Sequence, residues 1–136
     1  MKGLRRKPTD AELGILAVLW SRGPSTVRQI AEDMGREAAY TTILKLLQIM
    51  TEKGLVVRDE TARTHIYAAA CTQDQTQRQL VADLLERAFG GSAAKLVRQA
   101  LAASKTSPED LAEIRKMLRT ASRPTASDDS KPGGSR

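Results

Sequence analysis

The predicted helix Ala38–Lys53 carries the side chains whose types and spacing suit a defined chemical task. A step of about 100° per residue places Thr41, Lys45 and Gln48 on one face, with Thr42 beside them. Hydroxyl, amide and ammonium groups are the ones with which proteins contact base edges and phosphates of DNA. We therefore interpret this segment as a recognition helix.

The opposite face of this helix is apolar. Its residues follow the spacing i, i+3, i+4 and i+7, which predicts that they are buried against the rest of a domain. They are Ile43, Leu46, Leu47 and Met50. Gly54 is expected to end the helix, since glycine is favoured directly after a helix C-terminus.

A β-hairpin is predicted directly after this glycine. The segment Leu55–Val57 begins one strand, and His65–Tyr67 lies in the returning strand. Arg58 and Arg63 place cations beside a polar turn, which is typical of a wing that contacts phosphates or the minor groove. A recognition helix followed by such a hairpin indicates a winged helix-turn-helix and makes DNA the first partner to consider.

Residues around this surface also have other readings. Asp59 and Glu60 argue against a DNA contact by every residue of the wing, because carboxylates are repelled by phosphates. We interpret His65 as a strand residue, with a phosphate contact as the alternative. Tyr40 either reaches a phosphate through its hydroxyl or braces the preceding turn.

Two shorter helices are predicted before the recognition helix. Thr9 and Glu12 form a Thr-x-x-Glu capping box at the start of the first one, which is expected to run for about 11 residues and to end at Gly23-Pro24. Its expected apolar stripe consists of Leu13, Leu16, Ala17 and Trp20. We interpret the tryptophan as an anchor of the core rather than a ligand platform.

The second helix is expected to be capped by Ser25 or Thr26 and to end at Gly35. Its apolar residues are Val27, Ile30, Ala31 and Met34. Two helices joined by a tight turn match a helix-turn-helix, although such pairs also occur as simple packing units. The complete set of expected DNA contacts is Thr26, Arg28, Tyr40, Thr41, Thr42, Lys45, Gln48, Arg58 and Arg63.

The C-terminal half has a purely helical pattern. One helix is predicted from about Gln75 to Phe89, a second over Ser92–Ser104, and a third from Ser107 with Pro108 in its first turn. Three short amphipathic helices cannot bury their apolar faces alone, so we expect a partner subunit to share one core. The alternative is that they fold back on the winged helix of the same chain. The expected dimerisation residues are Leu80, Leu84, Phe89, Leu96, Val97, Ala100, Leu111, Ile114 and Leu118.

Composition limits the remaining classes. The net charge of +6 and the pI near 9.8 favour an anionic partner. The single cysteine, Cys71, excludes an intramolecular disulfide and fits a cytoplasmic protein, where we expect a small, partly buried residue rather than a redox sensor. The basic N-terminal segment has no apolar core and no run approaches about 18 apolar residues, so we expect no membrane insertion. No catalytic triad, metal-ligand set or phosphate loop is present, so we expect neither an enzyme nor a metal or cofactor.

The chain resembles the penicillinase and methicillin-resistance repressor family (the BlaI/MecI/CopY type). The resemblance covers about residues 8–119 and depends on the runs TDAELGILAVLW, GPSTVRQIAEDM, AAYTTILKLLQIMTEKGLV, RTHIYAA, LERAFGGSAAKLVRQALA and PEDLAEIRKML. It implies a dimeric winged-helix transcriptional repressor that binds a palindromic operator. It also implies that Thr41, Thr42 and Lys45 lie at the bases or adjacent phosphates, with Arg63 in the wing.

Two departures concern how such a repressor is released. Antibiotic-responsive members are inactivated when a membrane-bound sensor protease, often encoded nearby, triggers cleavage at an Asn–Phe bond. Gln99 and Ala100 occupy the matching positions here, so cleavage at this bond is a hypothesis and a role for β-lactams is in doubt. Copper-responsive members carry paired cysteines near the C-terminus, and Cys71 alone cannot form such a thiolate cluster.

These observations predict a mainly α protein with a winged-helix DNA-binding domain over residues 1–72 and a helical dimerisation domain over 73–120. A tail over residues 121–136, rich in Ser, Pro, Gly and charge, is expected to be disordered. The main competing interpretation is a sequence-tolerant, nucleoid-type DNA-binding protein. A pure protein-interaction module is a further alternative.

Overall fold

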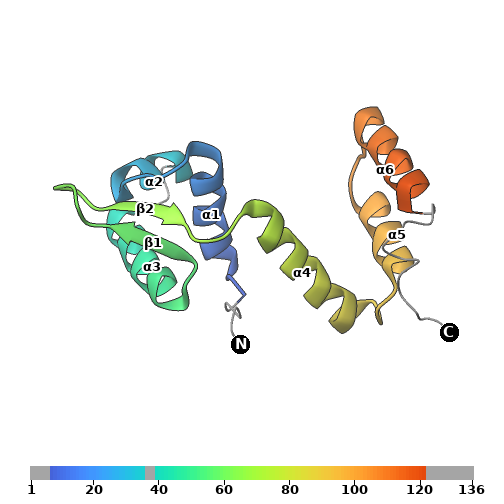
Figure 1. Cartoon of the computed structure of the whole chain (residues 1–136), viewed down its shortest axis with the longest axis horizontal. Coiled ribbons are helices and arrows are strands. Elements are labelled where there is room, and N and C mark those ends of the chain that lie inside the picture. The colour runs from blue at the N-terminus through green and yellow to red at the C-terminus, as the bar shows by residue number, and fades with distance from the viewer. Residues whose placement is uncertain (1–6, 36–38, 122–136) are drawn as a thin grey trace. The chain divides into compact units, whose positions relative to one another are not determined.

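The computed structural model describes residues 7–35 and 39–121 (Figure 1). In chain order these form α1 (Asp10–Arg22), α2 (Val27–Met34), α3 (Tyr40–Lys53), β1 (Val56–Asp59), β2 (Ile66–Ala69), α4 (Gln73–Ala88), α5 (Ala93–Ala103) and α6 (Pro108–Ala121). A hairpin that follows three helices confirms the predicted winged helix-turn-helix, and the remaining elements are helical, as expected. The predicted helix start at Ala38 lies outside the described residues, as does the expected tail from residue 122 onward. The first residue of that expected tail, Ala121, is instead the last residue of α6.

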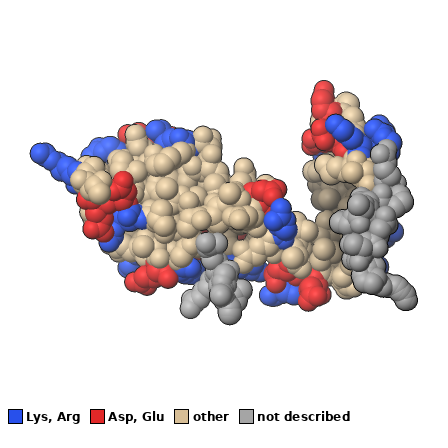
Figure 2. All heavy atoms as spheres, viewed as in Figure 1, with Lys and Arg blue, Asp and Glu red and all other residues tan. Residues whose placement is uncertain are grey.

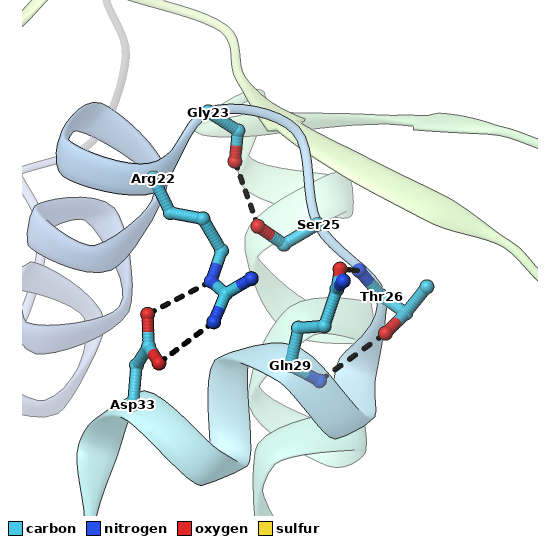
Figure 3. A network of polar contacts seen from close by, with 6 residues as sticks. All are labelled: Arg22, Gly23, Ser25, Thr26, Gln29 and Asp33. Carbon is cyan, nitrogen blue, oxygen red and sulfur yellow. Dashed lines mark hydrogen bonds and ion pairs between the residues drawn. The ribbon is translucent and has the colours of Figure 1, made fainter.

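The chain divides into two compact units, Met1–Ala88 and Phe89–Arg136, which we describe separately. Capping boxes start the first two helices of the N-terminal unit. The Thr9 amide donates to Glu12 Oε1 over 2.9 Å and the Glu12 amide donates to Thr9 Oγ1 over 3.2 Å, as predicted. Thr26, rather than Ser25, caps α2, through the same exchange with Gln29 (Figure 3).

The turn between α1 and α2 is fixed by polar contacts that Figure 3 shows. Arg22 at the end of α1 forms a bidentate ion pair with Asp33 of α2, with nitrogen–oxygen distances of 2.8 and 2.9 Å. The Ser25 hydroxyl donates to the Gly23 carbonyl over 2.7 Å. Gly23 has a φ of 95°, a value that glycine adopts without the strain of a side chain. These contacts hold the two helices of the helix-turn-helix together.

The core of this unit lies between α1, α2, α3 and the hairpin. Its buried apolar residues are Ile15, Leu16, Leu19, Val27, Ile30, Ile43, Leu47, Met50, Leu55, Val56 and Tyr67. Leu46, which we expected to be buried, is only partly buried at the edge of this core. The three fully buried members of the predicted α3 face therefore carry the packing of that helix.

The buried stripe of α1 differs from the predicted one. Ile15, Leu16 and Leu19 face the core, whereas Ala17 is exposed and Leu13 is only partly buried. The larger apolar side chains occupy the core because they bury more surface than alanine does. Trp20 is partly buried against the core and its Nε1–H donates to the Cys71 carbonyl over 3.0 Å, so it anchors the end of the hairpin to α1.

A buried ion pair joins α1 to the end of α3. Both Glu12 carboxylate oxygens lie 2.9 Å from Lys53 Nζ, and only 2% of Glu12 is exposed. Burial raises the pKa of this carboxyl, but the hydrogen bonds with Lys53 and Thr9 outweigh it and hold the pKa below its ordinary value. Sequence reasoning assigned Glu12 only to the capping box and missed this second role.

The hairpin pairs Val56 with Ala69, Val57 with Ala68, Arg58 with Tyr67 and Asp59 with Ile66. A short backbone bridge also joins β2 to the turn before α2. The Ser25 amide donates to the Tyr67 carbonyl over 2.9 Å, and the Tyr67 amide donates to the Ser25 carbonyl over 2.8 Å. Our interpretation of His65 as a strand residue was wrong, because β2 begins at Ile66 and His65 is exposed in the preceding loop.

Helix α4 completes the N-terminal unit. Thr72 caps it by exchanging hydrogen bonds of 3.0 Å with Gln75. Lys7 forms an ion pair with Asp83 of this helix over 2.7 Å. Cys71, just before α4, is partly buried, with its sulfur 3.1 Å from the Oγ1 of Thr76.

The C-terminal unit contains α5, whose ends lie within one residue of the predicted Ser92–Ser104, and α6, which begins at Pro108 after Ser107, as predicted. The Ser92 hydroxyl accepts from the Lys95 amide over 3.1 Å, and the Ser107 hydroxyl accepts from the Asp110 amide over 3.0 Å. No residue of these two helices is buried in the described part of the chain. Their apolar faces therefore form without an enclosed core.

Candidate nucleic-acid interface

Two hollows lie along the exposed face of α3. The first, which we call the wing groove, has a volume of about 720 Å³ and is bordered by α2, α3 and the hairpin. It is lined by Thr26, Val27, Arg28, Tyr40, Leu44, Gln48, Arg58, Arg63, Thr64, His65 and Tyr67. The second, the helix groove, has a volume of about 360 Å³ and is lined by Thr41, Thr42, Leu44, Lys45 and Gln48.

The two grooves are neighbours because Leu44 and Gln48 line both of them. Every residue of the expected DNA-contact set lines one groove or the other. The wing groove brings together the expected contacts of α2, the hairpin and the first turn of α3. The helix groove holds the two threonines and Lys45. Residues that are distant in the sequence thus share one surface, while their contact with DNA stays a prediction.

The local sequence explains why this face of α3 is open. Ile43, Leu47 and Met50 turn inward, so the intervening polar positions Thr41, Lys45 and Gln48 are exposed. The N-cap residue, Ala39, has no side-chain acceptor, unlike Thr9 and Thr26 at the starts of α1 and α2. The first turn of the recognition helix is therefore not covered by a cap of its own.

Three cations of this surface are available to an anionic partner. Arg28, Lys45 and Arg63 are exposed and form no ion pair within residues 7–35 and 39–121. Figure 2 shows Lys and Arg atoms at the tip of the hairpin, with acidic groups close beside them. The surface is thus a mixed one rather than uniformly basic.

Arg58 differs from these three because acidic and aromatic neighbours hold it. Its Nε donates to Glu60 Oε2 over 2.7 Å. The pKa of Arg58 is raised, first by a side-chain hydrogen bond with Tyr67 and then by Glu60. Tyr67 and Glu60 were absent from the predicted contact set, and only the strand register, which places Tyr67 opposite Arg58, reveals the connection.

Asp59 has a structural task in the turn. One of its carboxylate oxygens accepts from the Thr61 amide over 2.9 Å and from the Thr61 hydroxyl over 2.7 Å. These two bonds lower the pKa of Asp59. An aspartate that bonds the backbone two residues ahead is a common turn former. Asp59, whose charge counts against a DNA contact by every residue of the wing, therefore stabilises the turn of the hairpin.

His65 lies in the wing groove beside Arg58 and Arg63. It is exposed and precedes β2, so its imidazole belongs to the loop rather than to the sheet. The alternative, a contact of His65 with phosphate, stays a prediction. Tyr40 is 51% exposed and lines the same groove, with its ring available on the surface.

The expected dimerisation residues are all at least partly exposed in the single chain. Leu80, Phe89, Leu96, Leu111 and Ile114 are partly buried, whereas Leu84, Val97, Ala100 and Leu118 are exposed. Leu118, for example, keeps 63% of its surface accessible. Gln99 and Ala100, at the hypothesised cleavage position, are both exposed on α5.

Neither a membrane-spanning helix nor a metal-binding cluster is found among the described residues. No helix there is both long and apolar enough to cross a membrane. No group of three or more His, Cys, Asp or Glu residues within residues 7–35 and 39–121 is placed to hold a metal ion.

Comparison with known proteins gives two findings. Residues 8–120 match the family described as penicillinase repressor. Two curated relatives, each named transcriptional regulator BlaI, come from Mycobacterium tuberculosis strains CDC 1551 / Oshkosh and ATCC 25618 / H37Rv. Each is 38% identical over 82 residues, which cover 58% of this chain and 59% of the relative. The match thus spans well under two thirds of the relatives' length.

Proposed function

This chain belongs to the penicillinase repressor family, and on that premise we propose that it is a transcriptional repressor that binds a palindromic operator as a homodimer. It is not an enzyme, because the family is one of transcriptional repressors. The single observation that carries the proposal is the gathering of every expected DNA-contact residue around the two grooves beside α3.

In this proposal α3 lies in the major groove of DNA. A helix fits that groove, and hydroxyl, amide and ammonium groups can read the donors and acceptors of base edges there. Thr41, Thr42 and Lys45 in the first half of α3 contact bases or adjacent phosphates. The wing supplies Arg58 and Arg63 to the phosphates or to the minor groove. Thr26 and Arg28 of α2 contact the backbone and fix the orientation.

The proposed homodimer follows from the apolar surfaces that α5 and α6 leave uncovered. Val97 and Leu101 of α5 and Met117 and Leu118 of α6 are among the exposed large apolar residues of the chain. A second copy offers the same surfaces, and a two-fold symmetric dimer buries both sets against each other. Two symmetric winged helices then match the two halves of a palindrome.

Selection of duplexes from a random-sequence library by the full chain tests the operator. We expect a two-fold symmetric sequence that the chain prefers over random DNA, and sedimentation should show a dimer at micromolar concentration. Equal affinity for the selected and the random duplexes would favour the nucleoid-type alternative instead.

Lys45→Ala tests the placement of α3. If Lys45 contacts a base, this variant should lose about 1–3 kcal/mol of binding free energy to the selected duplex; if it contacts only phosphate, all duplexes should weaken alike and the salt dependence should become shallower. Lys105→Ala is the matched control, because it removes the same charge from the exposed loop between α5 and α6. Unchanged affinity in both Lys45→Ala and Thr41→Ala would remove α3 from the interface.

We also propose that repression ends when the dimerisation region is cut. The exposed position of Gln99 on α5 supports access by a protease. The resemblance makes a membrane-bound sensor protease the partner to seek, and a neighbouring gene that encodes an H-E-x-x-H zinc protease would support it. Intact chain in cells that have lost repression would count against this route.

A further inference from the structure

Arg58 lies on the inner face of the hairpin, although it is a charged residue. It directly follows Val57, which is exposed, and shares its face with Val56, which is buried in the core. Residues directly opposite each other on antiparallel strands point to the same side, and the residue opposite Arg58 is Tyr67. The side chains of Arg58 and Tyr67 therefore leave the sheet on the same face.

Tyr67 is buried in the core but carries a hydroxyl group, which an apolar core position does not need. Only 1% of it is exposed, yet it carries a hydroxyl, and a buried hydroxyl requires a hydrogen-bond partner. Tyr67 lines the wing groove together with Arg58, its cross-strand neighbour, and the Tyr67 side chain is the first cause of the raised pKa of Arg58. Phenylalanine would fill the same space in the core, so the packing alone does not account for the hydroxyl.

The charged neighbours of Arg58 show why the orientation of its guanidinium has to be fixed by specific contacts. Arg28 and Arg63 line the same groove, and like charges repel one another. Glu60 pulls the guanidinium from the other side, with 2.7 Å between Nε and Oε2. A free arginine side chain loses considerable rotamer freedom when it is fixed at an interface. Arg58 is already fixed between a tyrosine and a carboxylate.

We propose that Tyr67 is a positioning residue, which together with Glu60 holds Arg58 in the wing groove in the orientation that receives a DNA backbone phosphate. The Tyr67 hydroxyl itself does not contact DNA. This inference rests on the proposed function, since the phosphate is that of the operator. No pattern in the sequence connects this core residue with binding.

A double-mutant cycle with Tyr67→Phe and Arg58→Gln tests the inference on the selected duplex and on a random duplex of the same length. Tyr67→Phe should weaken binding about 3- to 10-fold, the range of one hydrogen bond. Arg58→Gln should reduce the salt slope by about 0.9, the value for one phosphate contact. In the Arg58→Gln background, Tyr67→Phe should cause no further loss, because the residue it positions is gone.

The opposite pattern would overturn the inference. If Tyr67→Phe weakens binding equally with and without Arg58, and leaves the salt slope unchanged, Tyr67 is only a packing residue. Circular dichroism and thermal unfolding of each variant control for loss of fold. Glu60→Gln is a surface variant that removes the carboxylate on the other side of Arg58. Because Tyr67 still positions Arg58, the affinity of this variant for the selected duplex should stay within about 3-fold of wild type.

A measurement on the wild-type protein without DNA separates this inference from the proposed function. In NMR spectra of the free chain, the Nε–H group of Arg58 should show restricted motion, whereas that of Arg63 should be mobile. Motion of Arg58 equal to that of Arg63 would contradict the positioning role even if the operator binds. Restricted motion without any DNA binding would instead remove the proposed function and leave the Tyr67–Arg58 pairing in place.

Discussion

The helices of the winged helix and the pair α5–α6 have similarly capped N-termini, but they differ in how much of their apolar surface is buried. Hydroxyl side chains cap α1, α2, α5 and α6 alike. Ile15, Ile30 and Leu47 of the winged helix are nevertheless completely buried, whereas no residue of α5 or α6 is. Local signals thus determine where each helix starts and ends, and only tertiary packing determines whether its apolar face is covered.

This difference indicates that the winged helix is stabilised by contacts within its own chain, whereas the C-terminal unit needs contacts from another chain. The winged helix closes its core with its own hairpin and an ion pair between α1 and α3. Helices α5 and α6 have enough apolar residues for a core, but within residues 89–121, the described part of their unit, no second layer covers them. The winged helix should therefore fold as a monomer, and the C-terminal unit should gain its stability from association.

The largest effect is expected from a charge placed in the apolar face of α6. Ile114→Asp should abolish dimerisation, because an unpaired carboxylate in a shared core is costly. Operator affinity should then fall by about 10²- to 10⁴-fold, the gain that a linked pair of modules provides. Sedimentation and binding to the selected duplex measure the two effects.

Ala112→Asp is the matched control, because it adds the same charge to an exposed position of α6. It should leave the dimer intact. Loss of the winged-helix fold in Ile114→Asp, seen by circular dichroism, would contradict the independence of the two regions. A wild-type monomer at micromolar concentration would contradict the dimer itself.

Truncation after Gln99 should produce a loss of affinity in the same range as Ile114→Asp or slightly smaller. The fragment lacks α6 and the end of α5, so two winged helices would bind half-sites without the effective-concentration gain. Gel shifts at increasing protein concentration should show two independent binding steps. Full-strength dimeric binding by this fragment would show that release works in another way.

An opposite test breaks the winged helix and spares α5 and α6. Lys53→Met removes the partner of the buried Glu12 carboxylate and should lower the free energy of unfolding of the winged helix by about 3–5 kcal/mol. Chemical denaturation of residues 1–88 measures this loss. A variant that changes both partners, Glu12→Gln with Lys53→Met, should recover much of the stability; no recovery would show that the ion pair is not the cause.

A smaller effect is expected from pH. The pKa of Glu12 is lower in the folded state than its ordinary value of 4.5, so the stability it contributes is present above about pH 4.5. It is lost as the pH falls through the folded-state pKa, because the protonated form no longer attracts Lys53. The difference in unfolding free energy between wild type and Glu12→Gln should therefore shrink below pH 4.5. A constant difference would contradict this linkage.

The smallest effect should come from the surface ion pair Arg22–Asp33 (Figure 3). Both side chains are more than a third exposed, and water and salt screen such pairs. Arg22→Gln should lower the stability of the winged helix far less than Lys53→Met does, and added salt should erase the difference. An effect as large as that of Lys53→Met would show that the turn between α1 and α2 limits the fold.

The sequence predicted the features that depend on local spacing. The capping box at Thr9, the glycine end of α3 and the polar face of Thr41, Lys45 and Gln48 all follow from residues a few positions apart. The helices α5 and α6 were predicted with nearly their observed bounds for the same reason. The open face of α3 needed only the helical period.

Features that join distant residues were not predictable in this way. Glu12 and Lys53 are separated by 41 positions, and no pattern in either segment names the other as a partner. The buried stripe of α1 was misplaced because several apolar residues compete for it and only the packed core selects Ile15 and Leu19. The link between Arg58 and Tyr67 depends on a strand register that the polar turn did not reveal.

The backbone bridge between Ser25 and Tyr67 has a consequence for how the chain would search along DNA. A wing attached only through its own two strands would sample many angles, and each binding event would have to freeze it. The two hydrogen bonds of this bridge tie β2 to Ser25 in the turn before α2. The helix-turn-helix and the wing would therefore bind the double helix as one preformed unit. The conformational entropy of the wing would already have been lost during folding, so it would not be a further cost of binding.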